Sequence, residues 1–137
     1  MRLTKCTSAD LPLLAEWNRH LIEDEGSDNP MSVPELEKRM RDFLSNDYTA
    51  YLFREGEKPV GYALIDLTKT PYYLRHFFIA RDSRRKRFGQ AAFSLLLREL
   101  DCDTVDVDVL TGNENGLAFW KSLGFRESWR HMRLHIT

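Results

Sequence analysis

At 137 residues, with 42% hydrophobic and 30% charged residues, the chain has the composition of an ordinary globular protein rather than of a fibrous, disordered or membrane-spanning one. Its 20 basic and 21 acidic residues nearly cancel, which argues against general attraction to nucleic acid or to a membrane surface. The length suits one folded unit, so we expect residues 1–137 to form a single domain.

The cysteine content and the N-terminal sequence both favour the cytoplasm. Cys6 and Cys102 lie far apart in the chain and outside any spacing typical of a metal site, so we expect two reduced thiols, with a single disulfide as the less favoured alternative. The N-terminal residues form no apolar leader, and no apolar run approaches the ~20 residues that span a bilayer. The sequence therefore predicts a cytoplasmic protein without a membrane segment.

The first third of the chain predicts one strand and two helices. Residues 2–6 suit a short strand. A Thr-x-x-Asp capping box at Thr7 predicts a helix that ends before the turn formers at Gly26, and a Ser-x-x-Glu capping box at Ser32 predicts a second helix. Both helical segments carry apolar residues at helical spacing, so each should bury one face.

The middle of the chain predicts three strands. Residues 48–54 and 60–67 are rich in aromatic and β-branched residues, and segment 55–59 between them has the glycine and proline of a hairpin turn. Residues 72–79 form an apolar run with several aromatic residues, which suits a buried strand.

Helices and strands alternate in the last third of the chain. Apolar residues at helical spacing predict a helix at 88–100, and valines that alternate with acidic residues predict a strand at 104–110. Together with the strand at 72–79 these elements suggest a parallel βαβ unit. A short helix at 115–123 and a strand region at 125–136 complete the chain.

Four consecutive cations, Arg84 to Arg87, precede the helix predicted at 88–100. Positive charge at the start of a helix opposes the helix dipole, so this turn is unfavourable unless an anion binds there. The first-turn amides of any helix lack partners, and a basic loop that leads into a helix with Gly89 in its first turn suits a phosphate. We interpret the turn as a phosphate site; a solvated basic turn and a nucleic-acid patch are the alternatives.

This turn resembles a motif of the GCN5-related N-acetyltransferases. Their signature for the pyrophosphate of acetyl-coenzyme A is Arg or Gln, two residues, Gly, one residue, then Gly or Ala. The first and last anchors match Arg84 and Gly89, but Arg87 stands in place of the middle glycine. Arg87 has less conformational freedom, yet it can present its amide if its φ is negative, and its side chain adds a charge for a phosphate.

A second family motif follows in the right order. It is an Asn after a strand, then a helix that ends in an aromatic residue, three residues and Gly-Phe, and it matches Asn113, Trp120 and the pair at 124–125. The resemblance covers residues 60–126 well and the first third only in the order of its elements.

The resemblance implies an α/β fold. The sheet would be mixed and mainly antiparallel, with six to seven strands and about four helices on both faces. It would split between its fourth and fifth strands, residues 72–79 and 104–110, where the coenzyme enters. Backbone near Phe78 would polarise the thioester carbonyl. The residues that the resemblance and the basic turn assign to acetyl-coenzyme A are Phe77, Phe78, Ile79, Arg84, Arg85, Lys86, Arg87, Phe88, Gly89, Gln90, Ala91, Asn113 and Trp120.

Asn113 and Trp120 also have simpler explanations. Asn is a typical helix cap. Trp120 stands where many family members carry a Tyr whose hydroxyl protonates the departing thiolate, and an indole delivers no proton at neutral pH. That acid is not strictly required, because a thiol with a pKa of about 8.5 is a fair leaving group. We interpret Trp120 as packing on the coenzyme arm, with a core Trp as the alternative.

An acceptor amine is mostly protonated at pH 7, so transfer needs a group that takes a proton. The acidic run 23–25 ends the first helix, in the segment that flanks the acceptor entrance in similar proteins. It suits a cationic acceptor; a solvated helix end is the alternative. Tyr73 falls where some family members place a catalytic Glu, although a phenol is a poor base. By alternation along the strand, His76 lies on the opposite face from Tyr73 unless a bulge intervenes. The candidate catalytic residues are Glu23, Glu25, Tyr73 and His76.

We therefore expect an N-acetyltransferase that moves an acetyl group from acetyl-coenzyme A to a primary amine by direct attack in a ternary complex. It would act as a monomer or homodimer, without nucleic-acid or membrane partners. The alternatives are an acyl-coenzyme A binding or sensing module that has lost its acid at Trp120 and, less favoured, a nucleic-acid-binding module. The remaining histidines have no metal-ligand spacing, so no metal is expected.

Overall fold

Five strands form one mixed sheet in the computed structural model, which describes residues 1–84 and 86–137. The first four strands are antiparallel to their neighbours, and the fifth is parallel to the fourth. The predicted mixed, mainly antiparallel α/β sheet is confirmed. In space the strands follow the chain order: β1 (Arg2–Lys5), β2 (Tyr48–Glu55), β3 (Lys58–Asp66), β4 (Tyr72–Ile79) and β5 (Val105–Asp106).

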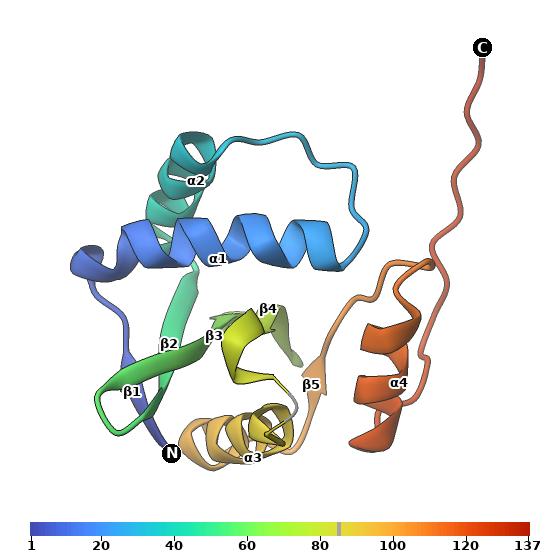
Figure 1. Cartoon of the computed structure of the whole chain (residues 1–137). Helices are drawn as coiled ribbons and strands as arrows, with labels where there is room; N and C mark the ends of the chain where they lie inside the picture. The colour runs from blue at the N-terminus through green and yellow to red at the C-terminus, as the bar shows by residue number, and fades with distance from the viewer. Residues whose placement is uncertain (85) are drawn as a thin grey trace.

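Helices cover both faces of this sheet, as the sequence predicts (Figure 1). Two helices lie on one face, a third lies on the other, and the fourth stands beside β5. None of the helices in the described ranges has the length and apolar composition that a bilayer crossing requires. In chain order they are α1 (Leu11–Asp24), α2 (Val33–Ser45), α3 (Phe88–Leu100) and α4 (Glu114–Ser122).

Both predicted capping boxes are formed. Thr7 N donates to the Asp10 carboxylate at 2.8 Å, and this box opens a short 3₁₀ turn that leads into α1. Ser32 N donates to Glu35 Oε1 at 3.0 Å, and Glu35 N donates to Ser32 Oγ at 3.3 Å at the start of α2. Each box satisfies amides that the first turn leaves unpaired, which fixes where the chain enters these helices.

Strands β2 and β3 are largely buried because helices pack on both of their faces. Alternating side chains meet α1 and α2 on one face and α3 on the other. The α1/α2 side includes Trp17, Tyr62 and Phe78, and the α3 side includes Phe53 and Phe93. Strand β4 contributes to both layers, with Phe78 on the α1/α2 side and Leu74 on the α3 side.

The predicted split between the fourth and fifth strands is present. Within the described part of the chain, β5 pairs with β4 only at Tyr72 and Tyr73. From there β5 leads away toward α4, while β4 continues to the turn before α3 (Figure 1). The last residues of β4 therefore keep one edge without a strand partner among the residues described.

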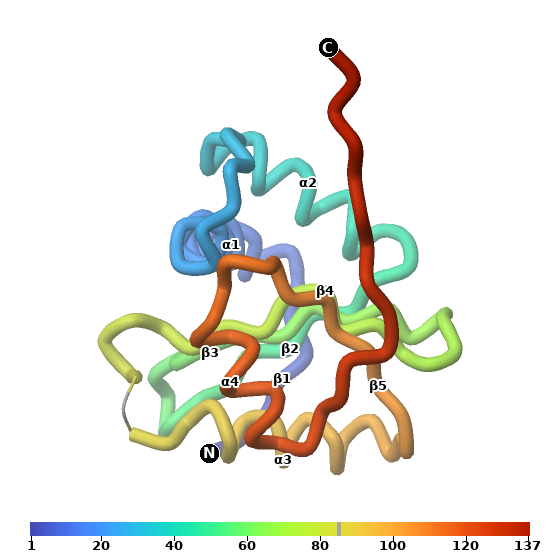
Figure 2. The backbone as a smooth tube through the Cα atoms, turned by 90° about the vertical axis from the view of Figure 1, so that its right-hand side faces the viewer, coloured from blue at the N-terminus to red at the C-terminus, as the bar shows by residue number. Residues whose placement is uncertain are grey.

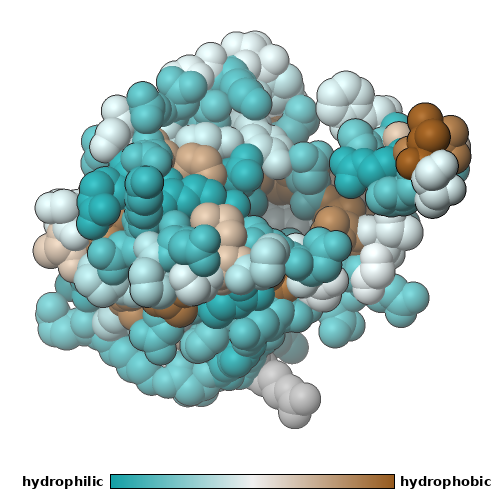
Figure 3. All heavy atoms as spheres, turned by 90° about the horizontal axis from the view of Figure 1, so that it is seen from above, coloured by the Kyte–Doolittle hydropathy of each residue, from teal (hydrophilic) through white to brown (hydrophobic). Residues whose placement is uncertain are grey.

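The predicted number of six to seven strands is wrong, because the region at 125–136 is no strand in the structure. The tail runs past α4 and away from the sheet (Figures 1 and 2). Its apolar side chains lie in solvent, with Trp129 84% and Ile136 89% exposed, and hydrophobic atoms stand out on an outlying segment in Figure 3. Alternating apolar residues form a strand only beside a partner with free backbone groups, and β5 supplies two residues.

The strand predicted at 104–110 is also shorter than expected. Only Val105 and Asp106 have strand pairing. Val107 still packs against the α3 side of the core. Asp108 accepts a hydrogen bond from the Tyr73 hydroxyl at 2.8 Å. The alternation of valine and aspartate thus predicts correctly that one face of the segment is buried, but it predicts more strand pairing than the structure has.

Candidate functional site

The start of α3 presents unpaired backbone amides. Arg87, the residue before the helix, makes no side-chain cap in the described structure. Ala91 N donates to Arg87 O at 3.3 Å, which is the first hydrogen bond of the helical ladder. The amides of Phe88, Gly89 and Gln90 precede that bond and have no partner within the helix. They lie at the positive end of the helix dipole, where an anion is favoured.

Arg87 adopts the left-handed conformation, with φ 61° and ψ 20°. The condition of a negative φ, under which the sequence allows Arg87 to present its amide, is therefore not met: this residue takes a conformation that favours glycine, at a cost of about 1–2 kcal/mol. Gly89 has another role. A Cβ at Gly89 would lie 3.1 Å from the ring of Phe119, so the missing side chain lets α4 pack against the start of α3.

The cations of the turn differ in their surroundings. Arg85 lies outside the described residues. Lys86 and Arg87 are exposed, so both side chains are accessible to a phosphate. Arg84 lies against the end of β4 instead: its Nε donates to Ile79 O at 3.0 Å. The predicted phosphate turn is thus basic in space as well as in sequence.

An ion-pair network joins this turn to the end of α1. Arg84 Nη2 lies 2.5 Å from one oxygen of Asp24, and Arg81 Nη2 lies 2.8 Å from the other. Arg81 also pairs with Glu23 at 3.1 Å and donates to the backbone oxygen of His20 at 3.4 Å. Arg81 was not among the sequence candidates, since it falls three positions before the motif.

The free edge of β4 exposes the backbone of Phe77 and Ile79. Ala80 N donates to Val60 O at 2.8 Å, and the β3–β4 register runs unbroken from there through Phe78. In an antiparallel ladder every second residue directs its N–H and C=O toward the partner strand, and the residues between direct theirs away. Phe78 therefore bonds to β3, and the N–H and C=O groups facing the split are those of Phe77 and Ile79.

In the structure Trp120 has the contacts of a core residue and Asn113 has those of a helix cap. Asn113 caps α4, since its Oδ1 accepts from Gly116 N at 3.0 Å. Trp120 packs edge-on in a cluster of rings that joins α4 to α3 and β4. The ring centroids closest to Trp120 are 5.4, 5.6, 5.0 and 5.0 Å away, in Phe77, Phe93, Phe119 and Phe125. A coenzyme contact by Asn113 or Trp120 stays a prediction.

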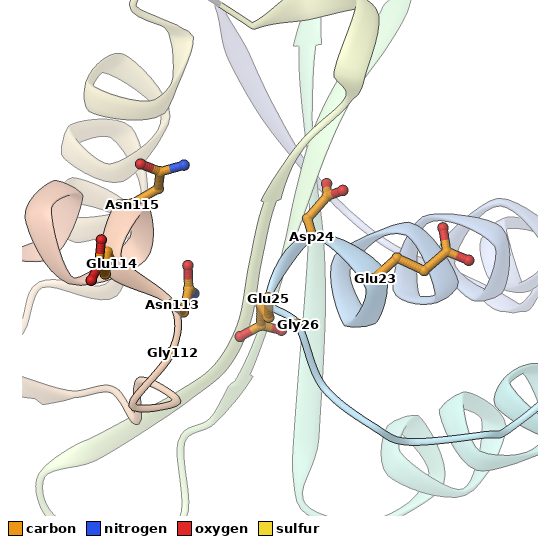
Figure 4. A pocket seen from close by; sticks show the side chains of 8 residues that line it. All are labelled: Glu23, Asp24, Glu25, Gly26, Gly112, Asn113, Glu114 and Asn115. Atoms are coloured by element: carbon orange, nitrogen blue, oxygen red, sulfur yellow. The ribbon is translucent and has the colours of Figure 1, made fainter.

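An acidic cavity of about 280 Å³ lies between the end of α1 and the start of α4. Its walls are residues 23–26 and 112–115, and β4 runs behind the gap between them (Figure 4). The Glu25 carboxylate lies at the gap between the two walls, whereas Glu23 points back along α1. The sequence candidates include the acids Glu23 and Glu25 of the first wall and, on the second wall, Asn113 as a coenzyme contact, but not Glu114, which no motif marks.

The acids at the end of α1 differ in their pKa values. Burial pushes the pKa of Asp24 upward, but hydrogen bonds from Arg81 and Arg84 outweigh burial, and the pKa lies below its ordinary value. Glu25 is half-buried, and burial together with the neighbouring charge of Asp24 raises its pKa. Asp24 is therefore a fixed anion in an ion pair, while Glu25 is a carboxylate that accepts a proton more readily than usual.

Tyr73 and His76 share one face of β4 because a bulge interrupts the ladder. The register shifts between Leu64, which pairs with His76, and Ile65, which pairs with Leu74. Leu74 packs on the α3 side, so its neighbour Tyr73 points to the α1/α2 side, where His76 also lies. Alternation along a regular strand predicts opposite faces for Tyr73 and His76 unless a bulge intervenes, and this bulge is present.

Neither Tyr73 nor His76 has the environment of a general base. Burial, and then the hydrogen bond to Asp108, raise the pKa of Tyr73 far above its ordinary value, so its phenol stays protonated. Burial lowers the pKa of His76 to about 3, with Arg39 as the next cause, and its Nδ1 lies 3.1 Å from the Tyr62 hydroxyl. Among the candidate bases, the geometry favours Glu25.

Solved structures share this fold. The BH1408 protein of Bacillus halodurans, solved as a tetramutant, is 22% identical with a TM-score of 0.81, over 99% of this chain and 100% of that one. A protein described as a predicted acetyltransferase of Clostridium acetobutylicum, solved with acetyl-CoA, is 17% identical with a TM-score of 0.72, over 98% and 95%. The aminoglycoside 6'-N-acetyltransferase AAC(6')-IG of Acinetobacter haemolyticus is 16% identical with a TM-score of 0.75, over 100% and 99%.

At these identities the structural likeness establishes the fold, and the family follows from the sequence. No curated protein sequence matches the chain. The family model described as "Acetyltransferase (GNAT) family" matches residues 14–125. This span runs from α1 to the Gly-Phe pair after α4 and includes the split, the basic turn and the acidic cavity. The chain therefore belongs to the GNAT acetyltransferase family.

Proposed function

We propose that this protein transfers the acetyl group of acetyl-coenzyme A to a primary amine, by direct attack of the amine in a ternary complex. The observation that carries the proposal is the meeting of three features at the split: the free edge of β4, the unpaired amides of α3 and the acidic cavity. The Clostridium acetobutylicum structure with acetyl-CoA supports the donor. The Acinetobacter haemolyticus aminoglycoside N-acetyltransferase supports an amine acceptor.

In this proposal the coenzyme lies in the split. Its pyrophosphate accepts hydrogen bonds from the first-turn amides of α3, with positive charge from Arg84, Lys86 and Arg87 close by. Its amide-containing arm pairs with the Phe77 backbone and the Ile79 N–H as an added strand would, since Arg84 Nε already holds Ile79 O. An N–H group of the same edge then polarises the thioester carbonyl.

The acceptor enters through the acidic cavity as an ammonium ion, which the carboxylates around it attract. Glu25 takes the proton that must leave before the nitrogen becomes nucleophilic. The nitrogen then forms a bond to the carbonyl carbon, the carbon–sulfur bond breaks, and the second proton of the nitrogen neutralises the thiolate. Trp120 has no part in proton transfer, since its indole only donates a hydrogen bond.

The first test is thermal unfolding with and without acetyl-coenzyme A, with a short oligonucleotide as the competing ligand. A ligand at 100 times its dissociation constant adds about 2.7 kcal/mol to the free energy of unfolding, which raises the midpoint by a few degrees in a chain of this size. We expect that shift with acetyl-coenzyme A and none with the oligonucleotide. Coenzyme binding without turnover on a panel of amines would identify a sensing module instead.

Reversing the charge at Arg84 is expected to raise the dissociation constant of acetyl-coenzyme A by about tenfold or more, because a charge-assisted contact to phosphate becomes a repulsion. Isothermal titration of Arg84→Glu measures this. Arg98→Glu is the matched control: the same charge change at the exposed far end of α3, more than a Debye length away. Equal constants in wild type and Arg84→Glu would refute this placement of the pyrophosphate.

A further inference from the structure

Arg84 stands where the three parts of the proposed site meet. Its Nη2 is paired with Asp24 at 2.5 Å, its Nε donates to Ile79 O at 3.0 Å, and its guanidinium carbon lies 5.2 Å from the ring centroid of Phe78. One side chain therefore joins the phosphate turn, the free edge of β4 and the wall of the acidic cavity. A ligand that binds the Arg84 side chain and moves it therefore changes the contacts in the phosphate turn, at the free edge of β4 and in the wall of the acidic cavity.

The two oxygens of Asp24 are not equivalent. Oδ2 is held by Arg84, which belongs to the phosphate turn, and Oδ1 is held by Arg81. Arg81 is anchored a second time, by Glu23 and by the backbone oxygen of His20. Removing Arg84 would therefore leave Asp24 in place, still tethered through one oxygen, and would free the other.

Asp24 lines the acidic cavity that we assign to the acceptor. With both guanidinium groups bound to it, the charge of Asp24 is largely cancelled. When one guanidinium group leaves Asp24, its carboxylate is no longer fully neutralised, and the net charge at the cavity becomes more negative. The occupancy of the phosphate turn and the charge of the acceptor cavity are thus connected through a single carboxylate.

We propose that Arg84 exchanges partners, leaving Asp24 for a phosphate of the coenzyme, and that coenzyme binding thereby unmasks Asp24 toward a cationic acceptor. This inference rests on the proposed function. The exchange is favourable because phosphate oxygens accept strong charge-assisted hydrogen bonds from guanidinium. The bond that is given up is weak, since the side chains of Arg84 and Asp24 are 40% and 26% exposed and water screens the pair.

The exchange makes the two ligands cooperate. If the coenzyme increases the affinity for the cation by some factor, the cation increases the affinity for the coenzyme by the same factor. The protein would then hold the coenzyme more tightly when an acceptor is present. Neither effect requires a change in the backbone, because only one side chain changes its partner.

The decisive experiment measures the dissociation constant of acetyl-coenzyme A by isothermal titration, which needs no known acceptor. In Asp24→Asn the coenzyme no longer competes with a carboxylate for Arg84, and we expect binding about three- to tenfold tighter than in wild type. Glu23→Gln removes the same charge from the adjacent residue without touching Arg84. We expect less than about a twofold change there, which measures the plain electrostatic effect.

A double-mutant cycle separates exchange from electrostatics. In an Arg84→Met background the Asp24→Asn substitution has no exchange to relieve, so its effect should fall to that of Glu23→Gln. Thermal unfolding of each variant checks that it folds. Binding weakened by Asp24→Asn would show that Asp24 holds the turn in shape, and an equal gain in both backgrounds would show only electrostatics; either result overturns the inference. A folded wild type that binds no coenzyme overturns both this inference and the proposed function.

Discussion

Replacing Glu25 with glutamine is expected to lower kcat/KM for acetyl transfer by about 10²-fold or more, which is the range for the loss of a positioned general base. Glu25 is half-buried, its carboxylate points into the acidic cavity, and burial with the charge of Asp24 raises its pKa. Glutamine keeps the size and polarity of the side chain but takes no proton. The measurement is release of free thiol with an amine found on a panel screen.

The role of Glu25 as a base also predicts how kcat/KM changes with pH. A base works when deprotonated, so kcat/KM of the wild type should rise with pH through the pKa of Glu25, which lies above the ordinary 4.5. That rising limb should disappear in Glu25→Gln. Glu16→Gln, the same change at an exposed position of α1 outside the cavity, should keep the wild-type profile. A rising limb that survives in Glu25→Gln would exclude Glu25 as the base.

Replacing Gly61 with alanine is expected to destabilise the fold by about 1–3 kcal/mol or more, the cost of forcing an extra group into a packed interior. A Cβ at Gly61 would overlap Phe78 O and lie 3.2 Å from Ile79 Cα. Both are backbone atoms of β4, so no side-chain rotation relieves the clash. The strand must move, and with it the edge that we assign to the coenzyme.

Thermal unfolding should show the midpoint of Gly61→Ala lowered by several degrees, since a change of 1 kcal/mol shifts it by about 2–8 °C in domains of 60–250 residues. Gly112→Ala is the matched control, because a Cβ there meets nothing within 4 Å. Its free energy of unfolding should change by no more than about 0.5 kcal/mol. A Gly61→Ala protein as stable as the control would mean that β3 and β4 separate easily at this point.

Much of the fold could be predicted because local signals agree with tertiary burial. The capping boxes at Thr7 and Ser32 and the apolar faces behind them mark the first two helices. The strands at 48–55 and 58–66 contain continuous buried runs, 50–53 and 60–66, because helices cover both of their faces. The strand predicted at 125–136 is wrong because the alternation of apolar residues is a local property, whereas a strand also needs a neighbouring strand to pair with. The sequence of the tail does not show whether such a neighbour is present.

The site could be predicted where a motif fixes it and not where geometry does. Arg84 and Gly89 mark the phosphate turn in sequence, but the left-handed backbone of Arg87 depends on how the turn closes between β4 and α3. The bulge that brings Tyr73 and His76 to one face also has no local signal, because it arises from the pairing with β3. Likewise, nothing in the basic motif predicts that Asp24, 60 residues away, holds its first arginine.

The free edge of β4 gives this sheet an uneven response to hydrogen exchange. Amides that bond to a neighbouring strand exchange with solvent deuterium only when the ladder opens, so β4 should exchange slowly where it faces β3. Its alternate amides at Phe77 and Ile79 face the split and need no such opening. Two rapidly exchanging positions inside a slow strand are thus the mark of an empty split, and they should become slow once an acyl donor completes the sheet.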